Sequence, residues 1–230
     1  MRTPMATSER TTETDDGYML LRRAILSGEL MPNERLIELD LAERYNLGRA
    51  AIRTALARLE QDGIVEREPF RGARVRLISE SEAIEILEAR AVLEGLAVRS
   101  AAKNATPADA AALRAIHKQM QVRFKAGDLL GVSEVNTALH TTLLEVAKHA
   151  TAARLIAGLQ AQNVRHQFRT ILVPGRAAKS LEEHRAIVEA VAGRDPDAAE
   201  AAMRLHLSHV VEALRQTSSA AVGKRAKPSS

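Results

Sequence analysis

Hydrophobic residues in the first 63 positions recur at helical spacing and predict three short helices. Leu21 and Ile25, four residues apart, mark the first helix, from about residue 16 to residue 27. A second helix is predicted from about residue 38 to residue 45. The third is predicted from residue 49 to residue 62, with an apolar stripe formed by Ile52, Ala55, Leu56 and Leu59. Gly63 is well suited to end it, because glycine readily adopts the left-handed conformation that follows many helices.

Two short strands are predicted after the third helix, at residues 64–67 and 73–77. The segment between them, Pro69-Phe70-Arg71-Gly72, has the composition of a hairpin turn. Three helices followed by a hairpin is the element order of a winged helix-turn-helix, a fold that binds DNA.

After residue 79 the pattern becomes almost continuously helical. Six helices are predicted, near residues 80–103, 107–126, 129–148, 150–172, 178–193 and 195–216, with glycine and proline between them. Alanine is abundant and aromatic residues make up only 2% of the chain, which favours a closely packed bundle. The predicted fold class is therefore mainly α: a winged helix-turn-helix of three helices and a two-stranded wing, followed by an all-α helical bundle.

The same pattern predicts four segments. Residues 1–15 are polar and without periodicity, as in a disordered leader. The DNA-binding domain is expected at residues 16–78 and the helical domain at residues 79–216. Residues 217–230 are small, polar and basic, which indicates a disordered basic tail.

Composition excludes several classes of protein. The 230 residues include no cysteine, so disulfide frameworks and thiolate chemistry are excluded. No run of 18 apolar residues is present, and the N-terminus lacks the apolar core of a secretory signal. We therefore expect a cytoplasmic protein that does not enter a membrane.

Arginine is concentrated in the predicted DNA-binding domain. Between residues 44 and 77 eight arginines accompany four acidic residues, although a genome that prefers arginine explains part of this bias. Arg49 and Arg53 lie four apart at the start of the third helix, where a recognition helix contacts base edges. Arg71 in the wing can reach phosphate or the minor groove, and Gly72 permits close backbone approach. A solvated basic face is the alternative interpretation of the arginine pair.

Residues 18–77 resemble the DNA-binding domain of GntR-type bacterial regulators. The matching run is ILSGELMPNERLIELDLAERYNLGRAAIRTALARLEQDGIVEREPFRGARV. The resemblance implies that Arg35, Arg49, Arg53 and the wing glycine Gly72 contact DNA. Gly48 stands where the family usually has a serine that caps the recognition helix.

The remainder, from residue 78 to about residue 215, resembles the FCD-type effector domain of the branch named after the fatty-acid regulator. The matching motifs are Arg90-x-x-x-Glu94, Asn136-x-x-x-His140, Glu183-His184 and Met203-x-x-His206. Family members often bind a divalent metal through an aspartate or asparagine and three histidines. Position by position, the resemblance implies that the metal ligands are Asn136, His140, His184 and His206.

The residues themselves leave two interpretations of these histidines. Asn136 and His140 share one helix face, and His184 and His206 lie on otherwise apolar stripes. A single histidine on such a face is usually a hydrogen-bonded core residue, whereas three that converge with a carboxamide favour a metal. Imidazole nitrogens with one oxygen suit Zn²⁺, with Ni²⁺ or Mn²⁺ as alternatives.

Arg90 also has two interpretations. It lies four residues before Glu94, so the two can form a salt bridge along the helix. In the family that this domain resembles, an arginine at the position of Arg90 often faces the pocket and pairs with an organic-acid effector. One guanidinium group can do both.

The predicted function is regulation of transcription, as a repressor or an activator, and not enzymatic catalysis. A homodimer would bind a palindromic operator in double-stranded DNA, with a small carboxylate effector that modulates the binding. The alternative is a metal-dependent hydrolase with a DNA-binding appendage, because three histidines could activate water. However, the sequence has no HExxH motif, glycine-rich phosphate loop or nucleophile motif. An architectural DNA-binding protein would leave the histidines on apolar faces unexplained.

Overall fold

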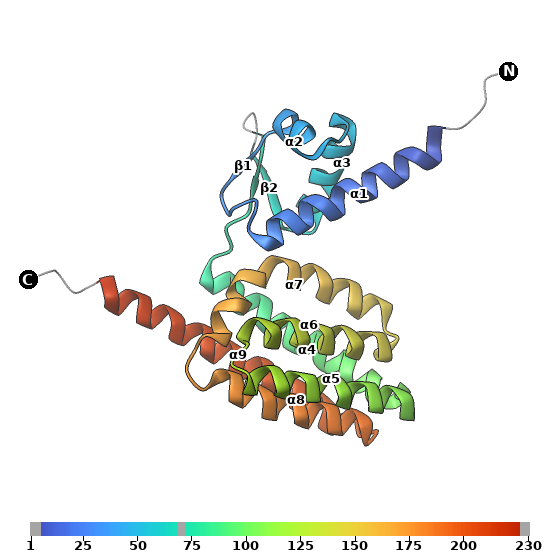
Figure 1. Ribbon diagram of the computed structural model, residues 1–230, viewed down its shortest axis with the longest axis vertical. Coiled ribbons are helices and arrows are strands. Elements are labelled where there is room, and N and C mark those ends of the chain that lie inside the picture. Colours follow the sequence, from blue (N-terminus) through green and yellow to red (C-terminus); the bar gives the residue numbers. More distant parts are fainter. Residues whose placement is uncertain (1–5, 69–71, 226–230) are drawn as a thin grey trace, which may run out of the picture. The chain divides into compact units, whose positions relative to one another are not determined.

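The computed structural model of the chain describes residues 6–68 and 72–225. The chain divides into two compact units, Met1–Ile78 and Ser79–Ser230. Figure 1 shows helices and a small sheet in the first unit, and helices alone in the second.

The first unit combines three helices with a small antiparallel sheet. The helices are α1 (Ala6–Ser27), α2 (Glu38–Tyr45) and α3 (Arg49–Gln61), and the strands are β1 (Arg35–Leu36), β2 (Val65–Glu68) and β3 (Gly72–Val75). The strand order is β1-β3-β2, with Arg35 opposite Arg74 and Glu66 also opposite Arg74. Three helices and a wing confirm the predicted winged helix-turn-helix.

Helix α3 buries the predicted apolar stripe. Ile52, Ala55, Leu56 and Leu59 are each at most 1% exposed. The helix ends as expected, because Gly63 has φ 69°, and the next amide, that of Ile64, donates to the carbonyl of Leu59 at 2.9 Å. Helix α1 packs against α3, where Leu21 is fully buried and the Tyr18 hydroxyl donates to the Asp62 carboxylate.

The first unit differs from the prediction in two places. Strand β1 adds a third strand to the expected two-stranded wing, and two residues are too few to show an alternating pattern. Helix α1 begins at Ala6, although residues 1–15 were expected to be a disordered leader. Hydrophobic periodicity detects a helix only through its buried face, and residues 6–15 are largely polar but contain no glycine or proline to stop a helix.

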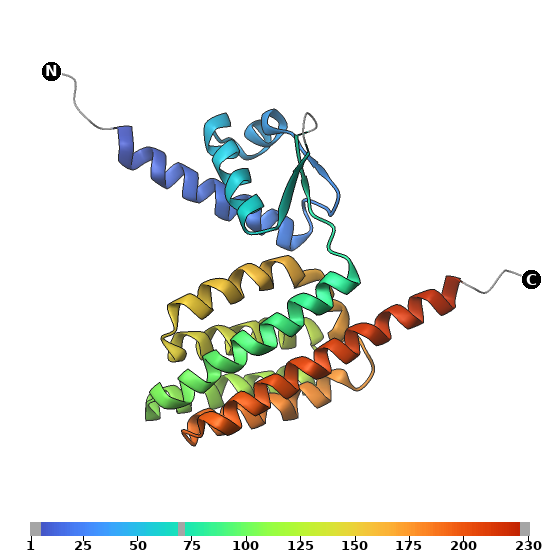
Figure 2. The ribbon, with the colours of Figure 1, turned by 180° about the vertical axis from the view of Figure 1, so that it is seen from behind.

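The second unit is a bundle of six helices. They are α4 (Glu80–Asn104), α5 (Pro107–Lys125), α6 (Leu129–Ala147), α7 (Ala150–Ile171), α8 (Arg176–Ala192) and α9 (Pro196–Arg225). Helices α4 and α9 run antiparallel and side by side (Figure 2). The all-α prediction is confirmed, although α9 extends beyond the expected end at residue 216.

Local sequence signals explain where these helices start. The Ser79 side chain accepts a hydrogen bond from the amide of Glu82, which caps α4. Thr106 and Asp109 form a reciprocal capping box at the start of α5, with Pro107 in the first helical position. Such caps fix the register of each helix, and therefore the side chains that it turns toward the bundle core.

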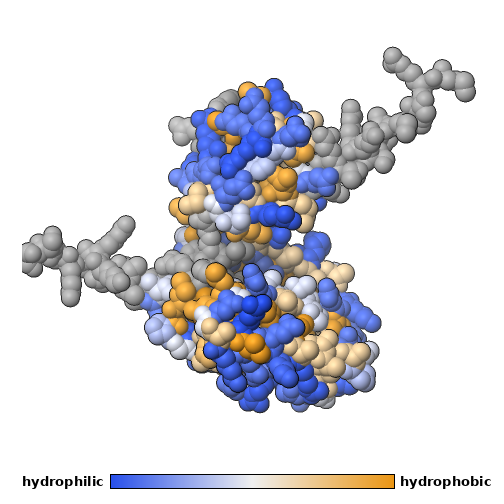
Figure 3. Space-filling view, viewed as in Figure 1, coloured by the Kyte–Doolittle hydropathy of each residue, from blue (hydrophilic) through white to orange (hydrophobic). Residues whose placement is uncertain are grey.

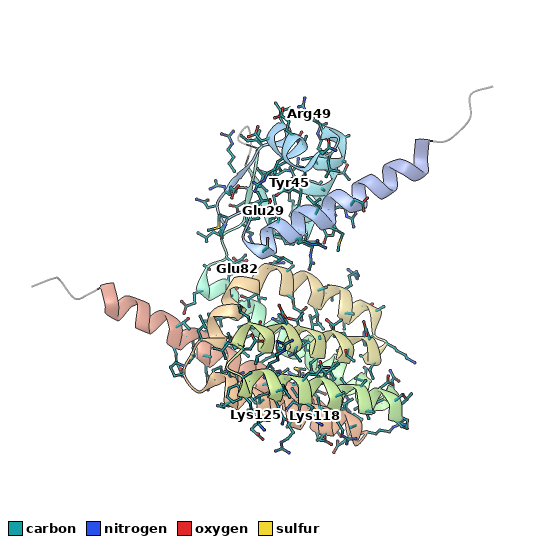
Figure 4. The ribbon with its side chains drawn as sticks, in the orientation of Figure 1. Glu29, Tyr45, Arg49, Glu82, Lys118 and Lys125 are labelled. Atoms are coloured by element: carbon teal, nitrogen blue, oxygen red, sulfur yellow. The ribbon has the colours of Figure 1, made fainter. Side chains whose placement is uncertain are left out.

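The surface of the bundle is mixed in character. Hydrophilic residues gather over α5 and α8 in the face that Figure 3 shows. Lys118 and Lys125 of α5 extend outward from this region (Figure 4). Among the described residues, no helix is both long and apolar enough to cross a membrane.

Candidate functional site

Helix α3 presents two arginines on its exposed face. Arg49 is its first residue, and Figure 4 shows it pointing outward from its unit. Arg53 follows one turn later, with 62% of its side chain exposed. Its guanidinium group contacts the Glu38 carboxylate of α2 at 3.3 Å, whereas Arg49 makes no ion pair among the described residues. An exposed ion pair of this kind is weak, so Arg53 can exchange Glu38 for another anion at low cost.

The other predicted DNA contacts lie on the sheet. Arg35 is exposed on β1, and Gly72 begins β3. Gly72 has φ 84°, a conformation that side chains rarely adopt, so backbone geometry is the reason for glycine here. Arg71 lies outside the described residues.

Three histidines converge in the core of the second unit. His140 comes from α6, His184 from α8 and His206 from α9, and each is at most 6% exposed. One ring nitrogen of each lies within 4.8 Å of the others, and the Nε2 atoms of His140 and His184 are 3.4 Å apart. The prediction that residues distant in sequence meet at one place therefore holds for these three side chains.

Two buried carboxylates orient the cluster. Glu94 lies 2.8 Å from Nδ1 of His140, and Glu183 lies 2.7 Å from Nδ1 of His206. A carboxylate only accepts hydrogen bonds, so Nδ1 of each ring carries a hydrogen, and the neutral form of the ring has its lone pair on Nε2. Each ring therefore has Nε2, and not Nδ1, available for a further interaction.

Burial disfavours a positive charge on two of the three histidines, His184 and His206. Desolvation, together with the neighbouring His206 and His140, holds the pKa of His184 well below its ordinary value. Desolvation likewise lowers the pKa of His206, with further contributions from His140 and Arg176. Neutral imidazole is the form that binds metals, because protonation would occupy the ligating lone pair.

The spacing between two of the histidines matches that of ligands on a divalent metal ion. Zinc–nitrogen bonds are about 2.0–2.1 Å long, and a tetrahedron with such bonds has N···N edges of about 3.3–3.4 Å. The 3.4 Å between the Nε2 atoms of His140 and His184 matches that edge. Asn136, one turn before His140, lines the same cavity as His140 and His206 and so places a carboxamide beside the cluster. These residues could hold a divalent ion.

The cavity beside the histidines has a volume of about 60 Å³. Apolar side chains such as Leu87, Met120 and Val132 form part of its wall, and two arginines, Arg90 and Arg176, also line it. One water molecule needs about 10–15 Å³ of such a cavity, so this one has room for about four to six waters or for a small organic molecule.

Arg90 forms the salt bridge that its spacing indicates and also reaches the cavity. Its guanidinium group lies 2.7 Å from the Glu94 carboxylate, and both side chains are 3% exposed. Burial alone would raise the pKa of Glu94, but Arg90 and His140 outweigh it and hold that pKa well below its usual range. Arg90, Glu94 and His140 therefore form one buried, connected chain.

A second chain of the same kind was not predicted from the sequence. Arg176 donates to Glu183 at 2.9 Å, and Glu183 contacts both His206 and His209 at 2.7 Å. A signal was present, because Arg176 and Glu183 are seven residues apart and so lie on one face of α8. His117 of α5 is also buried, and its Nε2 lies 3.0 Å from the carbonyl oxygen of Leu181.

A winged helix-turn-helix joined to an all-helical bundle is the arrangement of a class of two-domain, DNA-binding transcription regulators. Residues 15–75 match the family described as bacterial regulatory proteins, gntR family, and residues 85–209 match the FCD domain. The chain belongs to the GntR family and carries an FCD domain, so it is a DNA-binding transcription regulator.

Curated relatives agree with this assignment. The HTH-type transcriptional repressor RspR of Escherichia coli is 28% identical over 199 residues, which cover 86% of this chain and 87% of the relative. A probable D-xylose utilization operon transcriptional repressor of Paenarthrobacter nicotinovorans is 27% identical, over 88% of this chain and 90% of the relative. These relatives are named as regulators and not as enzymes, which argues against the hydrolase alternative.

Solved structures show the same fold. E. coli McbR/YncC superposes with a TM-score of 0.75 at 22% identity, covering 89% of this chain and 98% of that one. A putative GntR regulator from Rhodococcus sp. RHA1 gives a TM-score of 0.70 at 21% identity, with the same coverage. Identities this low support the fold alone.

Proposed function

We propose that this chain is a transcriptional repressor whose binding to operator DNA is modulated by a small organic acid held beside a divalent metal. Arg49 and Arg53 of α3 would enter the major groove, because they are exposed, basic and placed on the first turns of the recognition helix. Arg35, Arg71 and Gly72 would contact the flanking backbone or minor groove. A homodimer would place two such helices on a palindromic operator in the bacterial cytoplasm.

The observation that carries the proposed regulation is the buried histidine cluster beside an arginine-lined cavity. His140, His184 and His206 would bind the metal, with Asn136 as an oxygen ligand. Zn²⁺ suits this donor set best, with Ni²⁺ and Mn²⁺ as alternatives. When bound, the metal would supply a positive charge for a carboxylate oxygen of the acid, and Arg90 would orient the same carboxylate.

Metal content tests the first part of the proposal. Protein purified without chelator is expected to carry up to one divalent ion per chain, measured by elemental analysis. His184→Ala should lose the ion because it removes one of three converging nitrogens, whereas His149→Ala, outside the cluster, should retain it. Chelator should lower the melting temperature of the wild type, since an ion present at 100 times its Kd stabilises the folded state by about 2.7 kcal/mol. Absence of metal, with no thermal shift on adding Zn²⁺, Ni²⁺ or Mn²⁺, would return the histidines to a packing role.

Binding of acids tests the second part. Operator DNA can be obtained by selecting random duplexes on the immobilised protein, and small mono- and dicarboxylates can then be screened by thermal shift. At least one acid is expected to raise the melting temperature and to change operator affinity in a mobility-shift assay. Coupling of about 1–3 kcal/mol corresponds to a 5- to 150-fold change in that affinity. If no acid does either, the cavity is not an acid-sensing site.

A further inference from the structure

Arg176 has an unsatisfied donor inside the bundle. It is the first residue of α8 and is 7% exposed. Nη2 donates to Glu183 at 2.9 Å, but Nη1 is buried and has no hydrogen-bond partner among the described residues. A buried donor without an acceptor is destabilising, and a charged donor more so. The burial of Nη1 is explained if this nitrogen donates a hydrogen bond to a bound molecule that is not part of the chain.

The first turn of α8 faces the same cavity as Arg176. Ala177 and Ser180 contribute to the cavity wall together with Arg176. Gly175 precedes the helix with φ 77° and offers no capping side chain, and the first turn contains no acidic residue. The positive end of the α8 dipole therefore meets the cavity without a compensating anion from the protein.

The balance of charge in the cavity favours a ligand with two negative charges. Glu94 offsets Arg90, and Glu183 offsets Arg176. Imidazole and carboxamide ligands carry no negative charge, so a divalent ion bound by them would keep both of its positive charges. Buried charges without compensation are strongly disfavoured, and a dianion would compensate both.

We infer that Arg176 and the first turn of α8 form a second anion-binding point, so that the effector is a small dicarboxylate. One carboxylate would accept from Nη1 of Arg176 and the other would lie toward Arg90 and the histidine cluster. A four-carbon acid is consistent with a cavity of about 60 Å³. This inference rests on the proposed function, in which the cavity binds an acid.

Pairs of acids that differ by one carboxylate test the inference. Succinate is compared with butyrate, and malate with 3-hydroxybutyrate, by calorimetric titration of the metal-loaded, full-length protein. Wild type is expected to bind the dicarboxylate of a pair at least tenfold more tightly than the monocarboxylate. Arg176→Gln should reduce that preference about tenfold or more, because a hydrogen bond to a charged group is lost. Affinity for the monocarboxylate should stay within about twofold, since it does not need Arg176.

Matched variants separate binding from structure. Arg185→Gln removes the same charge from an exposed ion pair on the same helix and should keep the preference of the wild type. Arg176→Lys keeps the charge but loses the paired donors, so it should show an intermediate preference, and it provides a readout if Arg176→Gln folds poorly. Metal content and operator affinity without acid are measured for each variant.

The outcomes distinguish the inference from the proposed function. If the wild type binds acids of both kinds and Arg176→Gln leaves their affinity ratio unchanged, Arg176 only positions Glu183 and the inference is overturned. The same holds if the variant weakens both acids of a pair equally. If the wild type binds neither acid of either pair, the proposed acid-sensing function fails and the inference fails with it.

Discussion

Replacing Glu94 by glutamine is expected to lower the free energy of unfolding by about 3–5 kcal/mol. Glutamine keeps the shape of the side chain but removes its charge, so the guanidinium group of Arg90 stays buried without a counter-charge. Glutamine also offers one oxygen where glutamate offers two, so only one of the two donors, Arg90 or Nδ1 of His140, keeps its acceptor. Denaturant titration, with chelator present so that metal binding does not contribute, measures the effect.

Two comparisons decide whether this loss comes from the buried pair. Glu189→Gln breaks an ion pair with Arg114 that is about half exposed, and should change the free energy of unfolding far less. The double variant Arg90→Met/Glu94→Leu removes both charges and should recover much of the lost stability, because an apolar pair needs no compensation. A Glu94→Gln protein within 1 kcal/mol of the wild type would show that Arg90 remains hydrated.

Alanine at both Arg49 and Arg53 is expected to abolish sequence-selective binding of the operator. Each arginine can form a bidentate contact with guanine, and losing one contact costs about 1–3 kcal/mol, so the double variant should bind at least 30-fold more weakly. Both side chains are exposed on α3 and bury no core surface, so the fold should stay intact. Mobility-shift titrations on the selected operator, with circular dichroism of each variant, provide the measurement.

Two further variants test whether the expected loss of operator affinity depends on these positions and not only on the change in net charge. Arg185→Ala removes a positive charge from the other unit of the chain and should leave operator affinity within about twofold. Glu38→Gln releases Arg53 from its ion pair and should raise the affinity, since Arg53 then reaches DNA without first losing a partner. Operator binding by the double alanine variant at wild-type strength would assign DNA contact to another face.

The elements that bury a regular stripe could be predicted from the sequence. Helix α3 has four core residues at helical spacing and a glycine at its end, and the helices of the bundle are bounded by caps such as Ser79 and Thr106. Strand β1 is too short for any periodicity to show. The start of α1 at Ala6 could not be predicted from hydrophobic periodicity either, because the polar segment there has no apolar stripe.

The candidate site could be predicted only in part. The positions of His140, His184 and His206 follow from the motifs, and their apolar surroundings indicate burial. The link from Arg176 through Glu183 to His206 depends on how α8 packs against α9, and a sequence does not give the relative rotation of two helices. For the same reason the sequence left open whether Arg90 contacts Glu94 or the cavity, and the structure has it doing both.

The two buried Arg–Glu–His chains also constrain how such a protein can evolve. A single replacement of Arg90 or Glu94 passes through an intermediate with an unpaired buried charge, and the second chain imposes the same penalty at Arg176 and Glu183. Cavity residues without charge, such as Val132, carry no such penalty. Substitutions that reshape the cavity should therefore occur at its apolar wall positions, while each arginine and its glutamate are kept or lost together.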